Sequence, residues 1–469
     1  MLKNEQPFLP VAALAALLAV SCSPSTGGPT PASPSSRAPS GGASVASCVP
    51  TWQLTQAPVP SGDSAAGTDL AGVVAVSSTD VWAVGSTSST GGAQQTLVEH
   101  WGGSSWSTVP TPEPVDAASL GGTQLTAVSA VSADDVWAVG YIGSLTPPPT
   151  TTGVPPTAIA AQTLSEHWDG RTWSIVGLPD IAARDGVTPW DVLTAVVAIS
   201  QDDVWAVGVT EWDLGDGIPV AQPLVEHWNG AYWSLVDVPD PEPLPPDWAL
   251  AHDPVPAGTS GAVGSAALLG ITASSVDDVW AVGGYEDDRG AETGNVSPWA
   301  TLTEHWDGSS WSIVPAPDAT LPEPLSGGST QPDDLLSAAS ESPAGDLWAV
   351  GGALPGAALS LRRSGAAWSL VPSLAVTASG VSGWPGYWAP GSNDPTFLPG
   401  TIPLVGVITL SSTDAWAVGA VILHWNGASW QALYTVNGHS FGYLTGVGAL
   451  RSGGLWAVGG TTIVHATCA

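Results

Sequence analysis

The side chains with the clearest potential for chemistry in this sequence are histidines in a repeated context, as in "VEHW" at 98–101. Imidazole binds metals and transfers protons near neutral pH, so a His repeated beside carboxylates could build a metal or acid–base site. These histidines are His100, His167, His227, His305, His424 and His465. However, equivalent positions of a repeat are dispersed in space, whereas metal ligands must lie within about 2 to 2.5 Å of one ion. We therefore predict a structural role.

The expected partners of the histidines are aspartates that begin a second repeated motif, "DVWAVG". One Asp–His pair in each repeat would form a buried polar network. The aspartates are Asp80, Asp135, Asp203, Asp278, Asp346 and Asp414. One repeat differs and reads "LRRSGAAW" at 361–368. We interpret its Arg362 and Arg363 as charges that keep an exposed strand edge from aggregating, with a binding role as the alternative.

These motifs belong to a repeated set of four strands, here called a to d. Strand a is "LTAVSAVS" (125–132), strand b is "DVWAVG" (135–140), and strand c is "TLSEHW" (163–168). An Asp-Gly turn, a strong hairpin signal, then leads into strand d, "WSIV" (173–176). The unit is a four-stranded antiparallel meander. It recurs around the strand-b tryptophans Trp82, Trp137, Trp205, Trp280, Trp348, Trp416 and Trp456.

Seven such units predict an all-β fold, a seven-bladed β-propeller of four-stranded antiparallel blades. The unbroken apolar run "VWAVG" fits a strand that is covered on both faces. The last unit ends after its strand c. Its strand d is supplied by "TWQLTQAPVP" (51–60), whose Trp and Pro spacing matches "SWSTVPTPEP" (105–114). We expect the ring to close by the N-terminal strand joining the last blade.

Two cysteines lie at this expected closure. By comparison with a complete unit, Cys48 and Cys468 fall on adjacent residues of the missing turn between strands c and d. We therefore predict a Cys48–Cys468 disulfide that replaces the hairpin in an oxidising compartment. Two free thiols are the alternative.

The repeated "DVWAVG" with "EHWDGSSW" (304–311) resembles the seven-bladed propellers of the kelch and Asp-box (sialidase-type repeat) assemblage. "DGSSW" lies between strands c and d as an Asp-box does, although it is shorter and lacks the usual extra residue before Gly. The resemblance covers Cys48 to Ala469. It implies the fold but no single activity, because such propellers serve as hydrolases, oxidases, lectins and scaffolds. A sialidase-like site is disfavoured, since the predicted binding face offers only Arg184 and Arg289.

Long insertions occur only in the d-to-a and b-to-c connections, which emerge on one face of a propeller. The tryptophans outside strands b, c and d all fall in these insertions, and the densest group is "SGWPGYWAPGSND" (382–394). Such rings suit stacking on sugars or anchoring a protein interface. Packing of the loops onto the propeller is the alternative. The candidate ligand-binding residues are Trp190, Trp212, Trp248, Trp299, Trp384, Tyr387, Trp388 and Asp394.

Acidic segments at 211–217 and 285–292 share the insertion face. Oxygen-rich loops can bind calcium, but neither segment reproduces a known loop spacing. We therefore predict solvated acidic loops and no cofactor, with a calcium site as the alternative. A glycoside-active enzyme, hydrolase or lyase, would need two carboxylates about 5 to 9.5 Å apart. Nothing in the sequence selects a pair from Asp213, Asp216, Asp253, Asp287, Asp288 and Asp394.

The N-terminus has the features of an export signal. Lys3 precedes an apolar run at 8–20 that is too short for a permanent transmembrane helix. "LAVSC" (18–22) resembles the lipobox of bacterial lipoproteins, which implies cleavage before Cys22 and lipidation of its thiol; an ordinary signal peptide cut nearby is the alternative. We predict a signal peptide at 1–21, a Ser/Pro/Gly-rich linker at 22–47 and the propeller at 48–469.

Charge excludes one class of partner. With 8 Lys and Arg against 41 Asp and Glu, the net charge of -33 would repel a nucleic acid backbone. The sequence thus predicts an exported monomer at the cell membrane or surface that contacts the membrane through its lipid anchor only. The favoured function is non-enzymatic binding of a carbohydrate or protein ligand. The alternatives are the glycoside-active enzyme and an envelope assembly or structural scaffold.

Overall fold

Contacts divide the chain of this computed structural model into Met1–Cys48 and Val49–Ala469, and every described residue belongs to the second unit. The structure describes residues 50–58, 65–89, 93–143, 161–183, 187–213, 219–239, 241, 265–286, 299–319, 334–353, 357–372, 404–433, 441–450 and 454–468. Within these ranges, no helix is both long enough and apolar enough to cross a membrane. The predicted signal peptide, Cys22 and the linker lie outside the described residues.

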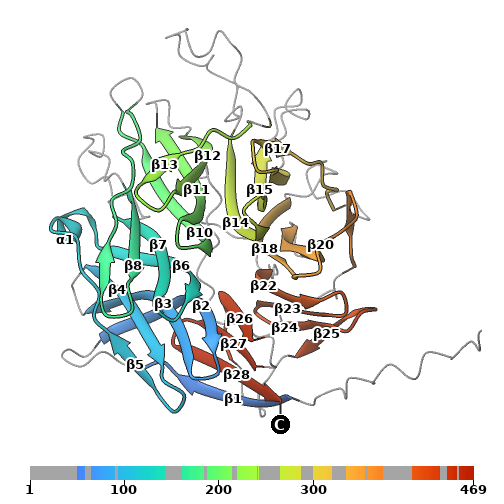
Figure 1. The fold of residues 1–469 in the computed structure, drawn as a ribbon, viewed down its shortest axis with the longest axis horizontal. Helices are drawn as coiled ribbons and strands as arrows, with labels where there is room; N and C mark the ends of the chain where they lie inside the picture. The colour runs from blue at the N-terminus through green and yellow to red at the C-terminus, as the bar shows by residue number, and fades with distance from the viewer. Residues whose placement is uncertain are drawn as a thin grey trace, which may run out of the picture. The chain divides into compact units, whose positions relative to one another are not determined.

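The described strands form seven four-stranded antiparallel sheets, which confirms the predicted propeller (Figure 1). Blades 1 to 3 are β2 (Ala65–Ser77), β3 (Asp80–Ser89), β4 (Gln94–Trp101), β5 (Trp106–Val109); β6 (Thr123–Ser132), β7 (Asp135–Ile142), β8 (Gln162–Trp168), β9 (Trp173–Ile175); and β10 (Trp190–Ser200), β11 (Asp203–Asp213), β12 (Pro219–Trp228), β13 (Trp233–Leu235). A single turn of helix, α1 (Ala117–Leu120), lies between blades 1 and 2 along the chain.

The later blades repeat the same order of strands. Blades 4 to 6 are β14 (Ala266–Ser275), β15 (Asp278–Glu286), β16 (Trp299–Trp306), β17 (Trp311–Ile313); β18 (Asp334–Glu341), β19 (Leu347–Ala353), β20 (Ala357–Ser364), β21 (Ala367–Leu370); and β22 (Leu404–Ser411), β23 (Asp414–Gly419), β24 (Ile422–Trp425), β25 (Trp430–Leu433). Blade 7 is β26 (Gly446–Leu450), β27 (Gly454–Gly459), β28 (Thr462–Cys468) and β1 (Pro50–Gln56).

The ring closes where the two ends of the described chain meet, as predicted. The N-terminal strand β1 pairs with β28, with Trp52 opposite Ala466. The main chain of Cys468 lies opposite Pro50, two residues after Cys48 in sequence. Cys48 and the side chain of Cys468 fall outside the described part of the chain, so the disulfide stays a prediction that the protein's mass before and after reduction would test.

The glycine that ends each "VWAVG" motif is explained by the neighbouring inner strand. In strand a the register shifts by one residue, for example between Leu193 and Ala195, and this bulge pushes the carbonyl of Val192 toward Gly208. A Cβ on Gly208 would lie 1.9 Å from the Val192 carbonyl oxygen, closer than any side chain can approach. The equivalent glycines with the same approach are Gly85, Gly140, Gly283, Gly351 and Gly459.

The tryptophans of strands b, c and d fill the interfaces between blades. The ring of Trp137 in blade 2 lies 5.1 Å from Trp228 and 5.5 Å from Trp233 in blade 3. Trp456 in blade 7 makes the same contacts with Trp101 and Trp106 of blade 1, at 5.2 and 5.4 Å. Edge-on and tilted rings at these distances are favourable. The repeated tryptophans are therefore the core that joins neighbouring blades.

Threonines at the bulges join neighbouring inner strands by hydrogen bonds. The Thr126 hydroxyl donates to the Leu193 carbonyl of the next blade at 2.7 Å, and the Thr194 hydroxyl donates to Leu268 at 3.0 Å. Thr445 of the last blade donates to Leu70 of the first at 2.9 Å. The inner wall of the propeller is thus linked across the chain ends as well as between consecutive blades.

Candidate binding face

The predicted Asp–His pairs are present and structural. The His167 ring stacks on Trp137 of its own blade, with centroids 4.3 Å apart, while its Nε2 contacts the Asp135 carboxylate. The Nε2–Oδ1 distances are 2.8 Å for His100–Asp80, 2.9 Å for His167–Asp135, 2.9 Å for His227–Asp203, 2.8 Å for His305–Asp278 and 3.1 Å for His424–Asp414. His465 has Gly454 in place of an Asp, stacks on Trp456, and has its pKa lowered by burial.

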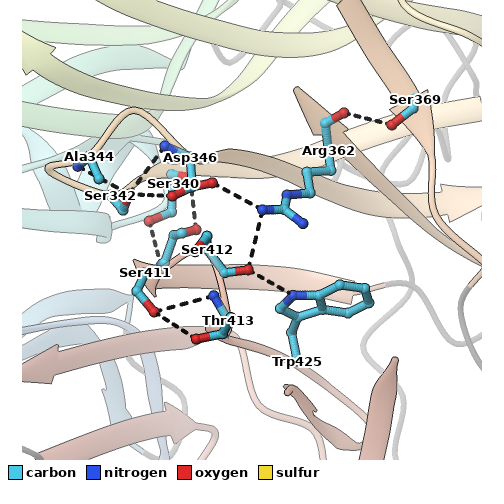
Figure 2. A network of polar contacts seen from close by, with 11 residues as sticks. Ser340, Ser342, Ala344, Asp346, Arg362, Ser369, Ser411, Ser412, Thr413 and Trp425 are labelled. Atoms are coloured by element: carbon cyan, nitrogen blue, oxygen red, sulfur yellow. Dashed lines mark hydrogen bonds and ion pairs between the residues drawn. The ribbon is translucent and has the colours of Figure 1, made fainter. Parts of the chain in front are cut away.

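The interpretation of Arg362 and Arg363 as exposed edge charges was wrong. Arg362 lies opposite Trp348, where the other blades have the histidine. Its Nη2 donates to Asp346 at 3.0 Å and to the Ser412 carbonyl at 3.2 Å (Figure 2). The guanidinium of Arg363 lies 4.4 Å from the centre of the Trp280 ring, a cation–π contact. Both side chains are half-buried between blades, because they occupy the His and Trp positions of strand c.

The c-to-d turns at one end of the blades are also accounted for by structural contacts. The Asp169 carboxylate accepts the backbone N–H groups of Arg171 and Thr172 at 2.9 and 2.8 Å, and these bonds lower its pKa. Asp307, Asn229 and Asn426 cap their own turns in the same way. The Asp-box-like residues therefore stabilise tight turns.

The opposite end, reached by the b-to-c and d-to-a connections, brings two of the candidate tryptophans together. Trp190 begins β10 and Trp299 begins β16, and both rings are half-buried. They pack against one hydrophobic cluster from blades 2, 3 and 4, formed by Tyr141, Ala161, Val192, Val209, Ala221 and Ala267. Trp212 is only 3% exposed, so its ring packs within the protein.

The remaining predicted residues of this face lie outside the described residues. These are Trp248, Trp384, Tyr387, Trp388 and Asp394, together with Asp216, Asp253, Asp287, Asp288 and the side chain of Asp213. Most of both acidic segments that could bind calcium is also outside the described ranges. Within those ranges, no three or more His, Cys, Asp or Glu side chains are grouped so that they could hold a metal ion.

Strand register adds a carboxylate beside each of the two tryptophans. Trp190 lies opposite Glu211 in blade 3, and Trp299 lies opposite Glu286 in blade 4. Both glutamates are half-buried. Two Trp–Glu pairs on neighbouring blades therefore flank one apolar cluster. Sequence reasoning missed the first pair because two bulges shift the register of β10 against β11. It missed the second because Glu286 and Trp299 are separated by an insertion, across which the register is not visible in the sequence.

A second set of acids, also missed, lies between the blades. The glutamate before each strand-c histidine in blades 1 to 4 is completely buried, and the set is Glu99, Glu166, Glu226 and Glu304. Burial raises the pKa of Glu99, Glu166 and Glu226 to about 8. The same position holds Leu361, Leu423 and Val464 in blades 5 to 7. The fold therefore accepts an apolar side chain at this position. Alignment of the repeats in the sequence already shows this difference between blades.

Comparison with known proteins gives no family and only distant structural likenesses. No protein-family model matches the sequence, and no curated protein matches it either. Among solved structures, "YCF48 bound to D1 peptide" is 12% identical with a TM-score of 0.45, covering 90% of this chain and 98% of that chain. A streptogramin B lyase is 11% identical with a TM-score of 0.44, covering 89% and 98%. A PL25 ulvan lyase is 9% identical with a TM-score of 0.45, covering 89% and 96%. No partner or activity is transferred from these likenesses.

Proposed function

We propose that this protein is a surface-anchored, non-enzymatic binding module that recognises a carbohydrate through the insertion-bearing ends of blades 3 and 4. The observation that carries the proposal is the pair of half-buried tryptophans, Trp190 and Trp299, on one hydrophobic cluster, each opposite a glutamate. Indole rings stack on the apolar faces of sugar rings, and carboxylates accept hydrogen bonds from sugar hydroxyls.

The position of the two tryptophans in the fold supports pre-organised binding. Each ring is the first residue of a paired strand, so its backbone is held by a ladder of hydrogen bonds rather than by a loop alone. The cluster beneath them is fully buried and comes from three blades. Rigid aromatic anchors lose little conformational entropy on binding, which raises affinity for a given contact area.

A binding role without catalysis is favoured by where the most strongly perturbed carboxyl groups lie. The groups with pKa values raised to about 8, Glu99, Glu166 and Glu226, are completely buried between blades and cannot contact a polysaccharide. General acid–base catalysis requires such a group within hydrogen-bonding distance of the substrate. Glycoside cleavage would therefore have to use other carboxylates. Asp191, beside Trp190, and half-buried Glu341 are such groups, and burial raises their pKa values to about 6 and about 7.

Binding should depend on the two tryptophans. We expect a Trp190→Ala, Trp299→Ala variant to bind a polysaccharide recognised by the wild-type protein at least about 30-fold more weakly, since losing a buried aromatic anchor costs about 2 kcal/mol or more. Isothermal titration across a polysaccharide panel measures the change, and near-UV circular dichroism checks the fold. The matched control is Tyr232→Ala, which removes an aromatic residue that is 62% exposed in the opposite turn of blade 3.

The proposal fails if the double variant binds as tightly as the wild-type protein, or if Tyr232→Ala weakens binding equally. The other informative result is that the wild-type protein binds no polysaccharide of the panel but binds a purified protein through the same face. That result would show that the ligand is a protein and not a carbohydrate.

The anchor is proposed from the N-terminal sequence alone. A lipid on Cys22 would hold the propeller at a membrane surface through the linker at 22–47. In a bacterial host, we expect the wild-type chain in the membrane fraction and a Cys22→Ala variant in the soluble or secreted fraction. Equal membrane retention of both chains would contradict lipidation at this residue.

A further inference from the structure

The interface between blades 2 and 3 contains a group of oxygen-bearing side chains with little solvent contact. Glu226 and Ser165 are completely buried, while Thr210 is 5% and Asp191 7% exposed. Among the described residues, neither carboxylate oxygen of Glu226 nor the hydroxyl of Ser165 has a hydrogen-bond partner. Buried polar atoms without partners are rare in native proteins, and an ordered water or an ion commonly accounts for them.

Strand alternation directs Ser165 and Glu226 into this same interface. Ser165 lies two residues before His167, whose ring stacks on Trp137, and Trp137 in turn contacts blade 3. Glu226 lies two residues after Leu224, which packs in one cluster with Trp137 and Val139 of blade 2. Because residues two apart in a strand share a face, the serine and the glutamate approach the interface from opposite blades.

Asp191 supplies a second carboxylate from the inner strand of blade 3. Its backbone N–H donates to the Ala161 carbonyl of blade 2 at 3.0 Å, which fixes this residue at the interface. One carboxylate oxygen accepts the Thr210 hydroxyl. Its charge lies close enough to Glu226 to raise the pKa of that glutamate further, after the larger effect of burial. Among the described residues, no ion pair with Lys, Arg or His involves either carboxylate.

We propose that a hard cation, with Ca²⁺ as the best-fitting candidate, binds at the blade 2–3 interface between Asp191, Glu226 and Ser165. The donor set consists only of carboxylate and hydroxyl oxygens, which hard cations prefer over nitrogen or sulfur ligands. Two carboxylates would balance one divalent charge. A bound cation would therefore supply the counter-charge that both carboxylates lack in the described structure, and so allow both to be buried in the ionised form.

The other blades provide an internal comparison. Leu361 and Leu423 occupy the position of Glu226 in blades 5 and 6, so an acid at this position is not needed to close an interface. Glu99 is equally buried in blade 1, but only its burial, and no second carboxylate, raises its pKa. Glu99 is therefore the matched control: it is the same residue in the same strand position without the second acidic ligand.

The test measures Ca²⁺ binding by the full chain at pH 7.5, by isothermal titration and by the shift in thermal unfolding between Ca²⁺ and EDTA. We expect Ca²⁺ to raise the unfolding temperature of the wild-type protein. Asp191→Asn and Glu226→Gln should each weaken Ca²⁺ affinity at least tenfold, and Ser165→Ala should weaken it less. Glu99→Gln should bind Ca²⁺ as the wild-type protein does.

Two outcomes would overturn the site. One is the absence of any heat or thermal shift with Ca²⁺ in the wild-type protein. The other is Ca²⁺ binding that survives in both Asp191→Asn and Glu226→Gln, which would place the ion in another part of the chain. Because Asp191→Asn and Glu226→Gln keep the size of the side chain and remove a group that is costly to bury as an anion, their apo forms should fold at least as well as the wild-type protein. Circular dichroism in EDTA verifies the fold of every variant before titration.

Discussion

Gly208→Ala is expected to destabilise the protein by about 3 kcal/mol or more, at the upper end of the cost of inserting a methyl group into a packed site. The added Cβ would lie 1.9 Å from the Val192 carbonyl oxygen and 2.9 Å from the Leu193 Cα, and both contacts are backbone atoms that cannot rotate away. Relief would require the bulge of β10 to move, yet this strand is bonded to the next blade through the Thr194 hydroxyl. The loss of stability is measured as the decrease in the urea concentration at the midpoint of unfolding, relative to the wild-type protein.

Gly177→Ala is the matched control for this variant. A Cβ at Gly177 would have no atom within 4 Å, so the same substitution should change stability by no more than about 0.5 kcal/mol. Similar unfolding midpoints for the two variants would show that the bulge does not force glycine at the end of "VWAVG", and the explanation of that repeated residue would be lost.

The second large effect is a fall in stability between about pH 5 and pH 8, measured in EDTA. The folded state keeps protons on Glu99, Glu166 and Glu226 up to pKa values of about 8, whereas the unfolded chain releases them near a pKa of 4.5. The folded state therefore binds more protons in this interval, and the free energy of unfolding declines as pH rises. Each site would account for a loss on the order of 3 kcal/mol.

Glu99→Gln isolates one of these sites. This variant should be more stable than the wild-type protein at pH 8 and lose less stability between pH 5 and pH 8. Asp307→Asn is the contrasting control: hydrogen bonds from Ser309 and Ser310 lower the pKa of this exposed carboxylate, so its contribution is lost only as pH falls below the ordinary range for Asp. A wild-type profile that rises toward pH 8, or one that Glu99→Gln leaves unchanged, would contradict buried neutral glutamates.

The repeated motifs predicted the fold because each one satisfies a local requirement of the blade. Asp135 and His167 are far apart in the chain, but their recurrence in successive units indicated a pair, and the structure confirms it. The closure by β1 was predictable because Trp52 keeps the spacing of a strand-d tryptophan. The prediction for Arg362 was wrong because it considered the charge of the residue and not its position in the repeat. Arg362 lies where the other blades have the histidine, and it contacts the aspartate as the histidine does.

The candidate site could be predicted only in part. The insertions indicated a face, but they did not show that Trp190 and Trp299 would share a cluster while Trp212 would be buried. Burial of Glu226 was hidden for the same physical reason. Both depend on side chains contributed by the neighbouring blade, and the sequence of one strand does not reveal what covers it.

We propose that this propeller binds a polysaccharide without cleaving it. The most direct test of this proposal is one assay in which the wild-type protein is incubated with each polysaccharide, and bound polymer and released oligosaccharides are measured on the same sample. We expect the protein to retain at least one polysaccharide and to release no reducing ends or unsaturated sugars. Product accumulation in proportion to protein and time would contradict it and establish a glycoside-active enzyme.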